Sequence, residues 1–374
     1  MSKMYRFCSK NCLVNVSNSI LAHYGLETYH PPMEDLVKRM EPYKKIVVLL
    51  FDGMATSLLK RHLKEDSFLR KHVFKEIDSI FPPTTVAATD ALLSGKYPKE
   101  TLWLGWSQYF KEINMNIDVF SNRETFTKEL SPYKNPMDEL GKYERIFDIV
   151  AKKRPSVAVK EVWPKFRKDG AQDLEEFLSR INDHLLNNKE ALMYGYWDSP
   201  DHEAHDHGVN SIYVKAFIEK VNDALESLTS VHKDTLFIVL ADHSLVDVEF
   251  LMIDEHRDFY DTLKRPFAIE PRAATFFVKR GRKQEFVELF NKYYGEYFDL
   301  YSKQEVKELN LFGYGKEHKD FDRMLGDFLA VSTSKYCFDY VLPHKKEKYY
   351  EECMIGAHAG GTEEEFKISL ILIN

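Results

Sequence analysis

The chain has 374 residues, of which 30% are charged, and its formal net charge is −7 at pH 7. This length allows a large buried core. The acidic balance excludes a bulk electrostatic footprint for nucleic acid or for an anionic membrane surface, so we expect its ligands to be small charged molecules.

The N-terminal segment predicts a helix over residues 14–24 and no secretory signal. A signal peptide needs a continuous apolar core. Here the apolar stretch is interrupted by Asn15, Ser17, Asn18 and Ser19. No later run approaches the roughly 18 apolar residues that span a bilayer. We therefore expect a cytoplasmic protein with no membrane partner.

The cysteines agree with that location. Cys8 and Cys12 lie near one end of the chain, and Cys337 and Cys353 lie near the other, without the spacing of a disulfide framework. We expect free thiols in a reducing compartment. Half of a metal site at Cys8 and Cys12 is the less favoured alternative.

Three apolar runs, KKIVVLLF, ALMYGYW and DTLFIVLA, predict buried parallel strands of one sheet. Acidic side chains follow each run, and a glycine-rich turn, IGAHAGGT, adds a lone histidine. The six candidate ligands are Asp52, Asp201, His205, Asp242, His243 and His358. In open α/β sheets, ligands collect outside the carboxyl ends of the strands. We therefore expect these side chains to meet at one sheet edge and to hold two divalent ions.

Each candidate ligand also has a purely structural alternative. Asp52 could belong to a strand-to-helix turn, and His358 could be a solvated loop residue. His205 shares one helical face with the preceding aspartate, but His202 and His207 compete with it. The ADH sequence is harder to explain without an ion, because a carboxylate buried beside an imidazole is costly when unpaired.

Between the first two runs, SIFPPTTVAATDALLSGKYP predicts an extended approach followed by a helix. Pro82 and Pro83 enforce the extension, and Thr84 or Thr85 opens an Ala/Leu-rich helix that ends near Gly95. The first turn of a helix favours an anion such as phosphate or sulfate. A threonine there is a candidate nucleophile if a divalent cation assists its deprotonation. A plain helix cap is the alternative.

The remaining patterns predict further helices, a lobe and a closing strand. We expect a polar helix at about 55–75, polar helices around a strand at PSVAVKEV, an amphipathic helix over 211–230 and a last core strand, KISLILI. The pattern changes to short aromatic-rich elements after residue 263. We therefore expect a catalytic core of residues 1–263 and 346–374, with an inserted smaller α+β lobe of residues 264–345.

In this order and spacing, the motifs resemble the alkaline phosphatase superfamily, most closely its type I phosphodiesterase/nucleotide pyrophosphatase branch. The resemblance rests on LLFDGM, FPPTTVAATDALLSGKYP, PDHEAH, ADH and GAHAGGT, which together run from residue 45 to 362. It implies an alkaline phosphatase-like three-layer α/β/α core with a mostly parallel central sheet. It also implies a site for two divalent ions, Zn²⁺ by preference, with Mn²⁺ or iron as alternatives.

The resemblance also implies a role for each candidate. One ion would be held by Asp201, His205 and His358, and the other by Asp52, Asp242, His243 and the nucleophile. In the family motif the nucleophile stands ten residues before the glycine that is Gly95 here, which selects Thr85 over Thr84. Thr85 would attack phosphorus to give a phosphothreonine, which water would then hydrolyse.

The implied function is hydrolysis of phosphodiester or nucleotide pyrophosphate bonds in a small phosphorylated substrate. The alternatives are a phosphonoacetate hydrolase-like or phosphomonoesterase activity, or a non-catalytic protein that binds a phosphorylated ligand. Nucleotide pyrophosphatases carry an asparagine downstream of the nucleophile where this chain has Trp106. Its indole could bind substrate or simply pack. Lys264, Arg265 and Arg272 could read the leaving group or be ordinary surface residues.

Overall fold

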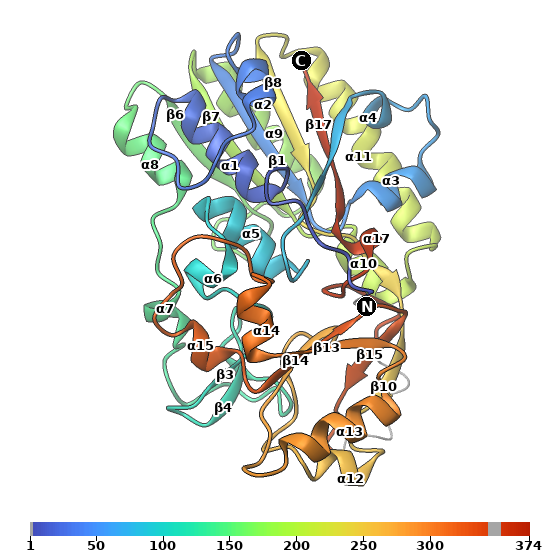
Figure 1. Cartoon of the computed structure of the whole chain (residues 1–374). Coiled ribbons are helices and arrows are strands. Elements are labelled where there is room, and N and C mark those ends of the chain that lie inside the picture. Colours follow the sequence, from blue (N-terminus) through green and yellow to red (C-terminus); the bar gives the residue numbers. More distant parts are fainter. Residues whose placement is uncertain (1–2, 343–352) are drawn as a thin grey trace.

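The computed structural model describes residues 3–342 and 353–374 and contains two main β-sheets (Figure 1). The larger sheet has the strand order β2-β17-β8-β1-β7-β6. Its strands are β1 (Lys45–Phe51), β2 (Val73–Asp78), β6 (Ala158–Val162), β7 (Ala191–Trp197), β8 (Thr235–Leu240) and β17 (Lys367–Ile373). Strands β6, β7, β1 and β8 are parallel, whereas β17 is antiparallel to both of its neighbours.

The three apolar runs form the adjacent central strands β7, β1 and β8, which confirms the prediction of buried parallel strands. Val47 of β1 lies opposite Met193 of β7 and Phe237 of β8. Every residue of these strands except Lys45 is buried. Continuous apolar sequence is needed here because both faces of the sheet are covered.

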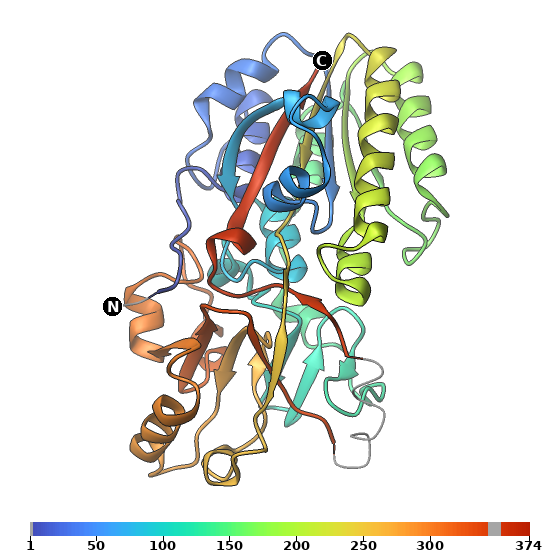
Figure 2. The same ribbon diagram turned by 90° about the vertical axis from the view of Figure 1, so that its right-hand side faces the viewer.

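Helices pack on both faces of the large sheet, so the predicted three-layer α/β/α arrangement is confirmed (Figure 2). Ile46, Val48 and Leu50 of β1 contribute to the core on one face, and Val47, Leu49 and Phe51 to the core on the other. The first face is covered by α1 (Leu13–His23), α2 (Glu34–Met40), α5 (Thr85–Ser94) and α8 (Ile146–Lys153). The second is covered by α3 (Thr56–His62), α4 (Phe68–Lys71), α9 (Leu174–Asn187) and α11 (Ile212–Ser230).

The polar residues that interrupt the apolar stretch of α1 have structural partners. Ser17 Oγ donates to the carbonyl of Leu92, and Asn18 Nδ2 donates to the carbonyl of Gly95 at 2.9 Å. Both acceptors lie at the C-terminal end of α5. Gly95 takes a left-handed conformation (φ 68°) that ends α5 where the sequence predicted.

One predicted helix is wrong in part. The pattern over about 55–75 predicts a single polar helix, but α3 ends at His62, α4 is a separate turn, and β2 begins at Val73. Leu63 takes an extended conformation that stops α3. Residues 73–78 become a strand because β17 offers them a hydrogen-bonding partner, a contact far away in the sequence.

The second sheet combines two distant parts of the chain. Its strands, in spatial order, are β13 (Phe298–Ser302), β14 (Phe328–Ser332), β12 (Ala273–Phe276), β11 (Ala268–Ile269), β3 (Ser107–Phe110), β4 (Met115–Asp118) and β5 (Arg123–Glu124). Strand β11 pairs with β3 through Ile269 and Ser107. The division into residues 1–263 with 346–374 and residues 264–345 stays a prediction, with residues 1–2 and 343–352 outside the described part. The structure adds residues 107–124 to the sheet of the smaller lobe.

Short elements complete the described part of the fold. Around the second sheet lie α6 (Pro98–Thr101), α7 (Met137–Leu140), α12 (Arg257–Tyr260), α13 (Lys283–Tyr293), α14 (Lys303–Glu308) and α15 (Phe321–Met324). Two small sheets pair β9 (Val246–Asp247) with β16 (Gly356–Ala357) and β10 (Glu249–Met252) with β15 (Tyr336–Asp339). The remaining helices of the described residues are α10 (Asp201–His207) and α17 (Glu363–Phe366).

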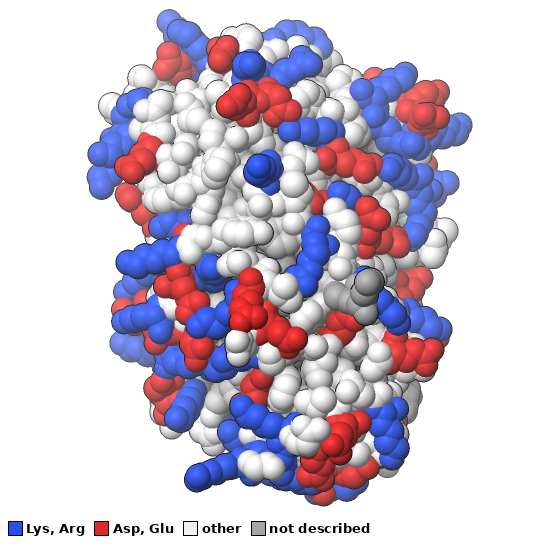
Figure 3. Space-filling view, viewed as in Figure 1, with Lys and Arg blue, Asp and Glu red and all other residues white. Residues whose placement is uncertain are grey.

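The surface carries mixed charge. On the face shown in Figure 3, acidic and basic side chains are interspersed, without a large field of one sign. None of the helices in residues 3–342 and 353–374 has both the length and the apolar character that crossing a bilayer requires.

A buried ion pair joins the second sheet to the C-terminal segment. Arg272, considered above as a possible surface residue, is fully buried and makes a bidentate pair with Glu365 of α17 at 2.8 and 2.9 Å. Glu365 also accepts hydrogen bonds from the N–H of Gly360 and from the hydroxyl of Thr362. The pair therefore holds the turn that carries His358 against β12.

A second buried carboxylate, Glu270, bridges the two sheets near α5. Its Oε1 accepts a hydrogen bond from the Thr84 hydroxyl at 2.7 Å and another from the N–H of Trp106 at 2.7 Å. Burial raises the pKa of Glu270 to about 7, although both hydrogen bonds favour the charged form.

Breaking the Arg272–Glu365 pair should destabilise the fold strongly. The change Glu365→Gln leaves the Arg272 guanidinium buried without a counter-charge, so we expect the free energy of unfolding to fall by about 3–5 kcal/mol. Glu364→Gln is the matched control, because Glu364 lies next in sequence but forms an exposed pair with Arg61, which contributes at most about 1 kcal/mol. Equal urea midpoints for the two variants would contradict the assignment.

Glu270 should make stability depend on pH. Because its folded pKa is raised, its stabilising contribution is fully present below about pH 4.5 and is lost as the pH rises towards 7. The total loss should be about 3 kcal/mol. We expect Glu270→Gln to remove this part of the pH dependence in urea unfolding at pH 5 and pH 8 after EDTA treatment. The control is Glu226→Gln, an exposed position on α11.

Candidate metal centre

The three predicted aspartates lie together at the carboxyl ends of β1, β7 and β8. The N–H of Asp52 donates to the carbonyl of Trp197 at 2.8 Å, and the N–H of Asp201 donates to the carbonyl of Asp52 at 3.1 Å. The N–H of Gly53 donates to Asp242 Oδ1 at 3.1 Å. Backbone hydrogen bonds between neighbouring strand ends thus bring the carboxylates to one edge of the sheet.

One cluster of ligand atoms consists of Asp52, Asp242 and His243. All three residues are buried, and their ligand atoms lie within 4.8 Å of one another. His243 Nε2 is 3.3 Å from Asp52 Oδ1 and 3.5 Å from Asp242 Oδ2. This arrangement could hold a cation, and the residues are those the sequence analysis grouped around one ion.

A second cluster consists of Asp201, His243 and His358, again with ligand atoms within 4.8 Å. His243 therefore faces both clusters, and its ring stacks on that of His358 with centroids 3.9 Å apart. His205, which the sequence analysis grouped here, lies beside the cluster. Its Nε2 is 3.3 Å from Asp201 Oδ2, and its Nδ1 bonds to the carbonyl of Gly356 at 2.7 Å.

The competing histidines point elsewhere. His202 is exposed beside Asp206, and the exposed His207 stacks on Tyr213. Cys8, Cys12 and Cys337 form no disulfide with one another, and no described cysteine belongs to a ligand cluster.

Unpartnered polar atoms support cation binding at both clusters. Asp242 Oδ2, Asp201 Oδ1 and His358 Nδ1 are buried and have no hydrogen-bond partner among the described residues. A buried polar atom without a partner costs free energy. Three oxygen and nitrogen atoms of this kind, around carboxylates and imidazoles, match the donor set that divalent ions such as Zn²⁺ prefer. The residues present therefore fit a metal centre, while the identity of the metal stays a prediction.

The protonation behaviour of the site reflects crowded like charges. Burial raises the pKa of Asp52 well above its usual value, and the nearby Asp242 and Asp201 raise it further. Burial also raises the pKa of Asp242. Burial opposes ionisation of Asp201 as well, but His205, His358 and His243 hold its pKa below the usual range. Burial and the neighbouring His243 keep the pKa of His358 well below its ordinary value. The site thus has an excess of acidic groups that a bound cation would neutralise.

Thr85 is placed at the centre of this arrangement. It is the first residue of α5, and Thr84 occupies the N-cap position with an extended backbone. Thr85 Oγ lies 3.1 Å from His243 Nε2 and 3.2 Å from Asp52 Oδ2. The Thr84 hydroxyl points instead to Glu270. The two threonines considered in the sequence are therefore separated by orientation: only the Thr85 hydroxyl contacts candidate ligands.

Two residues near the site were missed by the sequence analysis. The hydroxyl of Tyr196 in β7 donates a short hydrogen bond to Asp52 Oδ2, and Glu270 holds Thr84. The position of Tyr196 near the end of an apolar strand was a sequence signal that could have placed it near the site. Glu270 had no such signal, because only the pairing of strands in the second sheet brings it to α5.

Trp106 lies at the edge of the same region. Its backbone N–H donates a hydrogen bond to Glu270. The residue is 42% exposed, and its ring contacts the ring of Phe120 edge to face. The indole thus occupies an exposed position and packs on one neighbouring ring. A packing role and contact with substrate both stay predictions.

Comparison with known proteins identifies the fold and the family. The structure is similar to that of murine ectonucleotide pyrophosphatase/phosphodiesterase 5, with a TM-score of 0.64, 16% identity and 87% of each chain covered. An inactive threonine-to-alanine variant of the murine protein in complex with AMP gives a TM-score of 0.63, 16% identity and coverage of 87% of this chain and 86% of the other. The human counterpart gives 0.64 and 14%, with 87% of each chain covered.

These similarities confirm the alkaline phosphatase-like fold. A search of curated protein sequences gave no match. The family model described as "Type I phosphodiesterase / nucleotide pyrophosphatase" matches residues 46–358, a span that contains the six predicted metal ligands, Thr85 and Trp106. The chain therefore belongs to the type I phosphodiesterase/nucleotide pyrophosphatase family, a family of hydrolases.

Proposed function

We propose that the protein hydrolyses phosphodiester or nucleotide pyrophosphate bonds through a covalent intermediate on Thr85. The observation that carries this proposal is the position of Thr85 Oγ, 3.1 Å from His243 Nε2 and 3.2 Å from Asp52 Oδ2. Family membership supports the class of reaction. The AMP bound to a structural neighbour supports a small phosphorylated substrate.

Two divalent cations belong to this proposal, Zn²⁺ by preference and Mn²⁺ or iron as alternatives. One would be held by Asp201, His205 and His358, and the other by Asp52, Asp242, His243 and Thr85, with His243 near enough to both clusters to couple them. When bound, such cations supply Lewis acidity, which favours the alkoxide of a bound hydroxyl and neutralises charge that develops on phosphoryl and leaving-group oxygens.

The residues of the chain position and activate the nucleophile. Asp52 and His243 lie within hydrogen-bonding distance of Thr85 Oγ and orient it, and Tyr196 donates to Asp52 and so restrains that carboxylate. The first N–H groups of α5 face the same region and favour a negatively charged phosphoryl group. Glu270 holds Thr84 and thereby the start of α5.

Two displacements at phosphorus complete the cycle. Thr85 Oγ forms a bond to phosphorus as the bond to the leaving oxygen breaks, and the leaving group departs with its electron pair. Water then attacks the phosphothreonine, the Thr85 Oγ–P bond breaks, and the hydroxyl regains a proton. Most of the acceleration would come from positioning and charge neutralisation.

Two finer points are part of the proposal. The exposed ring of Trp106 could stack on a nucleobase or an aromatic leaving group. The cytoplasmic location expected from the sequence stays a prediction.

Thr85→Ala should abolish hydrolysis of bis-p-nitrophenyl phosphate, with a loss of at least about 1,000-fold in kcat. Thr84→Val is the matched control, because that hydroxyl contacts Glu270 instead of the candidate ligands, and it should retain more activity than Thr85→Ala. Intact-mass spectrometry of acid-quenched wild type should show a phosphoryl adduct on Thr85. Full activity of Thr85→Ala would rule out the nucleophile, and a protein that binds AMP without any turnover would favour the non-catalytic alternative.

Asp201→Asn should weaken binding of one cation. We expect metal analysis by plasma mass spectrometry to give about two divalent ions per wild-type chain, with binding at one site at least about tenfold weaker in the variant. Asp206→Asn is the control on the same helix, since Asp206 is exposed. A wild-type protein that turns over substrate in the presence of EDTA would contradict the role of the cations.

A further inference from the structure

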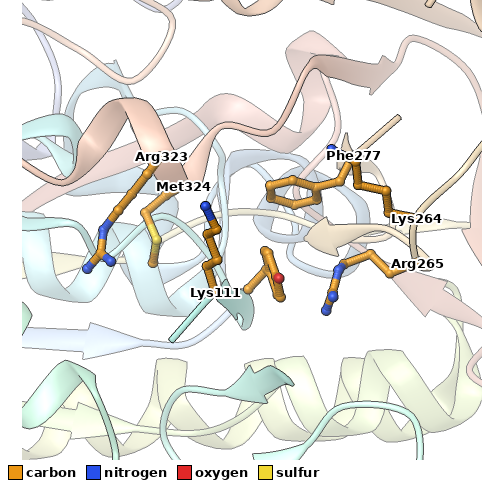
Figure 4. Close-up of a pocket in the computed structure, with 7 residues that line it drawn as sticks. Lys111, Lys264, Arg265, Phe277, Arg323 and Met324 are labelled. Carbon is orange, nitrogen blue, oxygen red and sulfur yellow. The ribbon is translucent and has the colours of Figure 1, made fainter. Parts of the chain in front are cut away.

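The second sheet carries a basic pocket of about 220 Å³ that is separate from the candidate metal centre. Its cations are Lys111, Lys264, Arg265 and Arg323, and the rings of Tyr109 and Phe277 form its apolar wall. In Figure 4, Arg323 lies on one side, Lys264 and Arg265 on the other, and Lys111 between them. None of the described lining residues is a candidate metal ligand or nucleophile.

The pocket is built by segments that meet only in the folded chain. Tyr109 and Lys111 belong to the end of β3 and the turn after it, and Arg323 belongs to α15. Lys264 lies before β11, where its N–H donates to the carbonyl of Phe277 at 2.8 Å. The Phe277 ring packs edge to face on Tyr109, with centroids 4.8 Å apart. These backbone and ring contacts hold the cations around one cavity.

Arg265 is the most informative residue of the pocket. Its guanidinium lies over the Tyr109 ring at 3.4 Å and donates to the side-chain oxygens of Asn114 and Asn116. It is half-buried, and burial lowers its pKa. A partly buried charge whose hydrogen-bonding partners are neutral is costly. Because these two amides leave several of its N–H groups free, Arg265 could also bind an anion in bidentate fashion.

The charge balance of the pocket is positive. Arg323 is neutralised by Glu112 and Asp320. Within residues 3–342 and 353–374, no carboxylate lies at ion-pair distance from Lys111, Lys264 or Arg265. Asp327 interacts electrostatically with Lys264, but its carboxylate is paired with Lys283 at 2.7 Å. Glu124 acts on Arg265 electrostatically, without an ion pair between them. Three cations therefore face one cavity without a counter-charge.

We propose that this basic pocket is a second anion-binding site, which takes a phosphate or pyrophosphate group. The cavity is smaller than the roughly 300–1,000 Å³ of sites that enclose drug-sized ligands. It suits a compact, multiply charged anion, and any organic part of the ligand would extend outside. Arginine and lysine are the residues that bind phosphate oxygens, and the Tyr109 and Phe277 rings keep solvent from one side. The site does not depend on the catalytic role proposed for Thr85.

The test uses the whole protein with its metals and pyrophosphate as the probe. In hydrogen exchange followed by mass spectrometry, pyrophosphate should slow exchange of the backbone around 109–114 and 264–265. By calorimetry, Lys264→Gln/Arg265→Gln should weaken this binding at least about tenfold, because two charged contacts are lost. The control Lys168→Gln/Lys233→Gln removes the same charge from exposed positions elsewhere and should bind as wild type does.

Three results would overturn the proposal. One is the absence of slowed exchange at the pocket segments, including the case where pyrophosphate protects only the segments around Asp52 and Asp242. Another is equal affinity in the pocket variant and the control. The third is loss of bis-p-nitrophenyl phosphate hydrolysis in a folded pocket variant, which would make the pocket part of the catalytic site. Binding of phosphate and of AMP is then compared, because phosphate is a free anion whereas AMP has an organic part that would extend outside the cavity. Tighter binding of AMP identifies the phosphate of a nucleotide as the ligand, and equal binding identifies a free anion.

Discussion

The crowding of three aspartates, Asp52 and Asp242 buried and Asp201 partly buried, is the constraint on which the rest of the structure depends. Asp52 and Asp242 follow β1 and β8, and Asp201 begins α10 shortly after β7, so the pairing of those three strands brings the carboxylates together. Like charges at this spacing cannot all ionise without compensation. Three imidazoles and the hydroxyl of Tyr196 provide part of it. Buried oxygens that still lack a partner are placed where a bound cation could provide the remainder.

Two buried contacts link the second sheet to the segments that carry residues of the site. Arg272, directly before β12, binds Glu365, and Glu365 in turn holds the turn after His358. Glu270, two residues earlier, holds Thr84 and so the start of α5. Both links start from the turn between β11 and β12, at Glu270 and Arg272. This turn of the second sheet thus supports the segment after His358 and the start of α5, which carries Thr85.

The core strands, and the residues that meet at their ends, could be predicted from the sequence for a common reason. Buried parallel strands are continuous apolar runs, and residues that directly follow them are placed by the strand itself, as Asp52 and Asp242 show. The i, i+4 spacing of Asp201 and His205 puts them on one helical face, and their side chains lie 3.3 Å apart. Their role as ligands stays a prediction. The sequence pattern gave a wrong prediction for residues 73–78, because a strand that depends on pairing with β17 has no local signal. Arg272 was considered as a surface residue, because nothing near it in the sequence indicates a pairing with Glu365.

The sequence by itself determined the layered core, the order of the motifs and the types of ligand available, because these follow from hydrophobic periodicity and from residues adjacent to it. Only the tertiary structure decided which threonine faces the candidate ligands, that His243 belongs to both clusters, and that β3 pairs with β11 to extend the second sheet. It also decided that Lys111, Lys264 and Arg265 surround one cavity. These features are contacts between segments far apart in the chain, and side-chain orientation and long-range pairing are set by packing of the whole molecule.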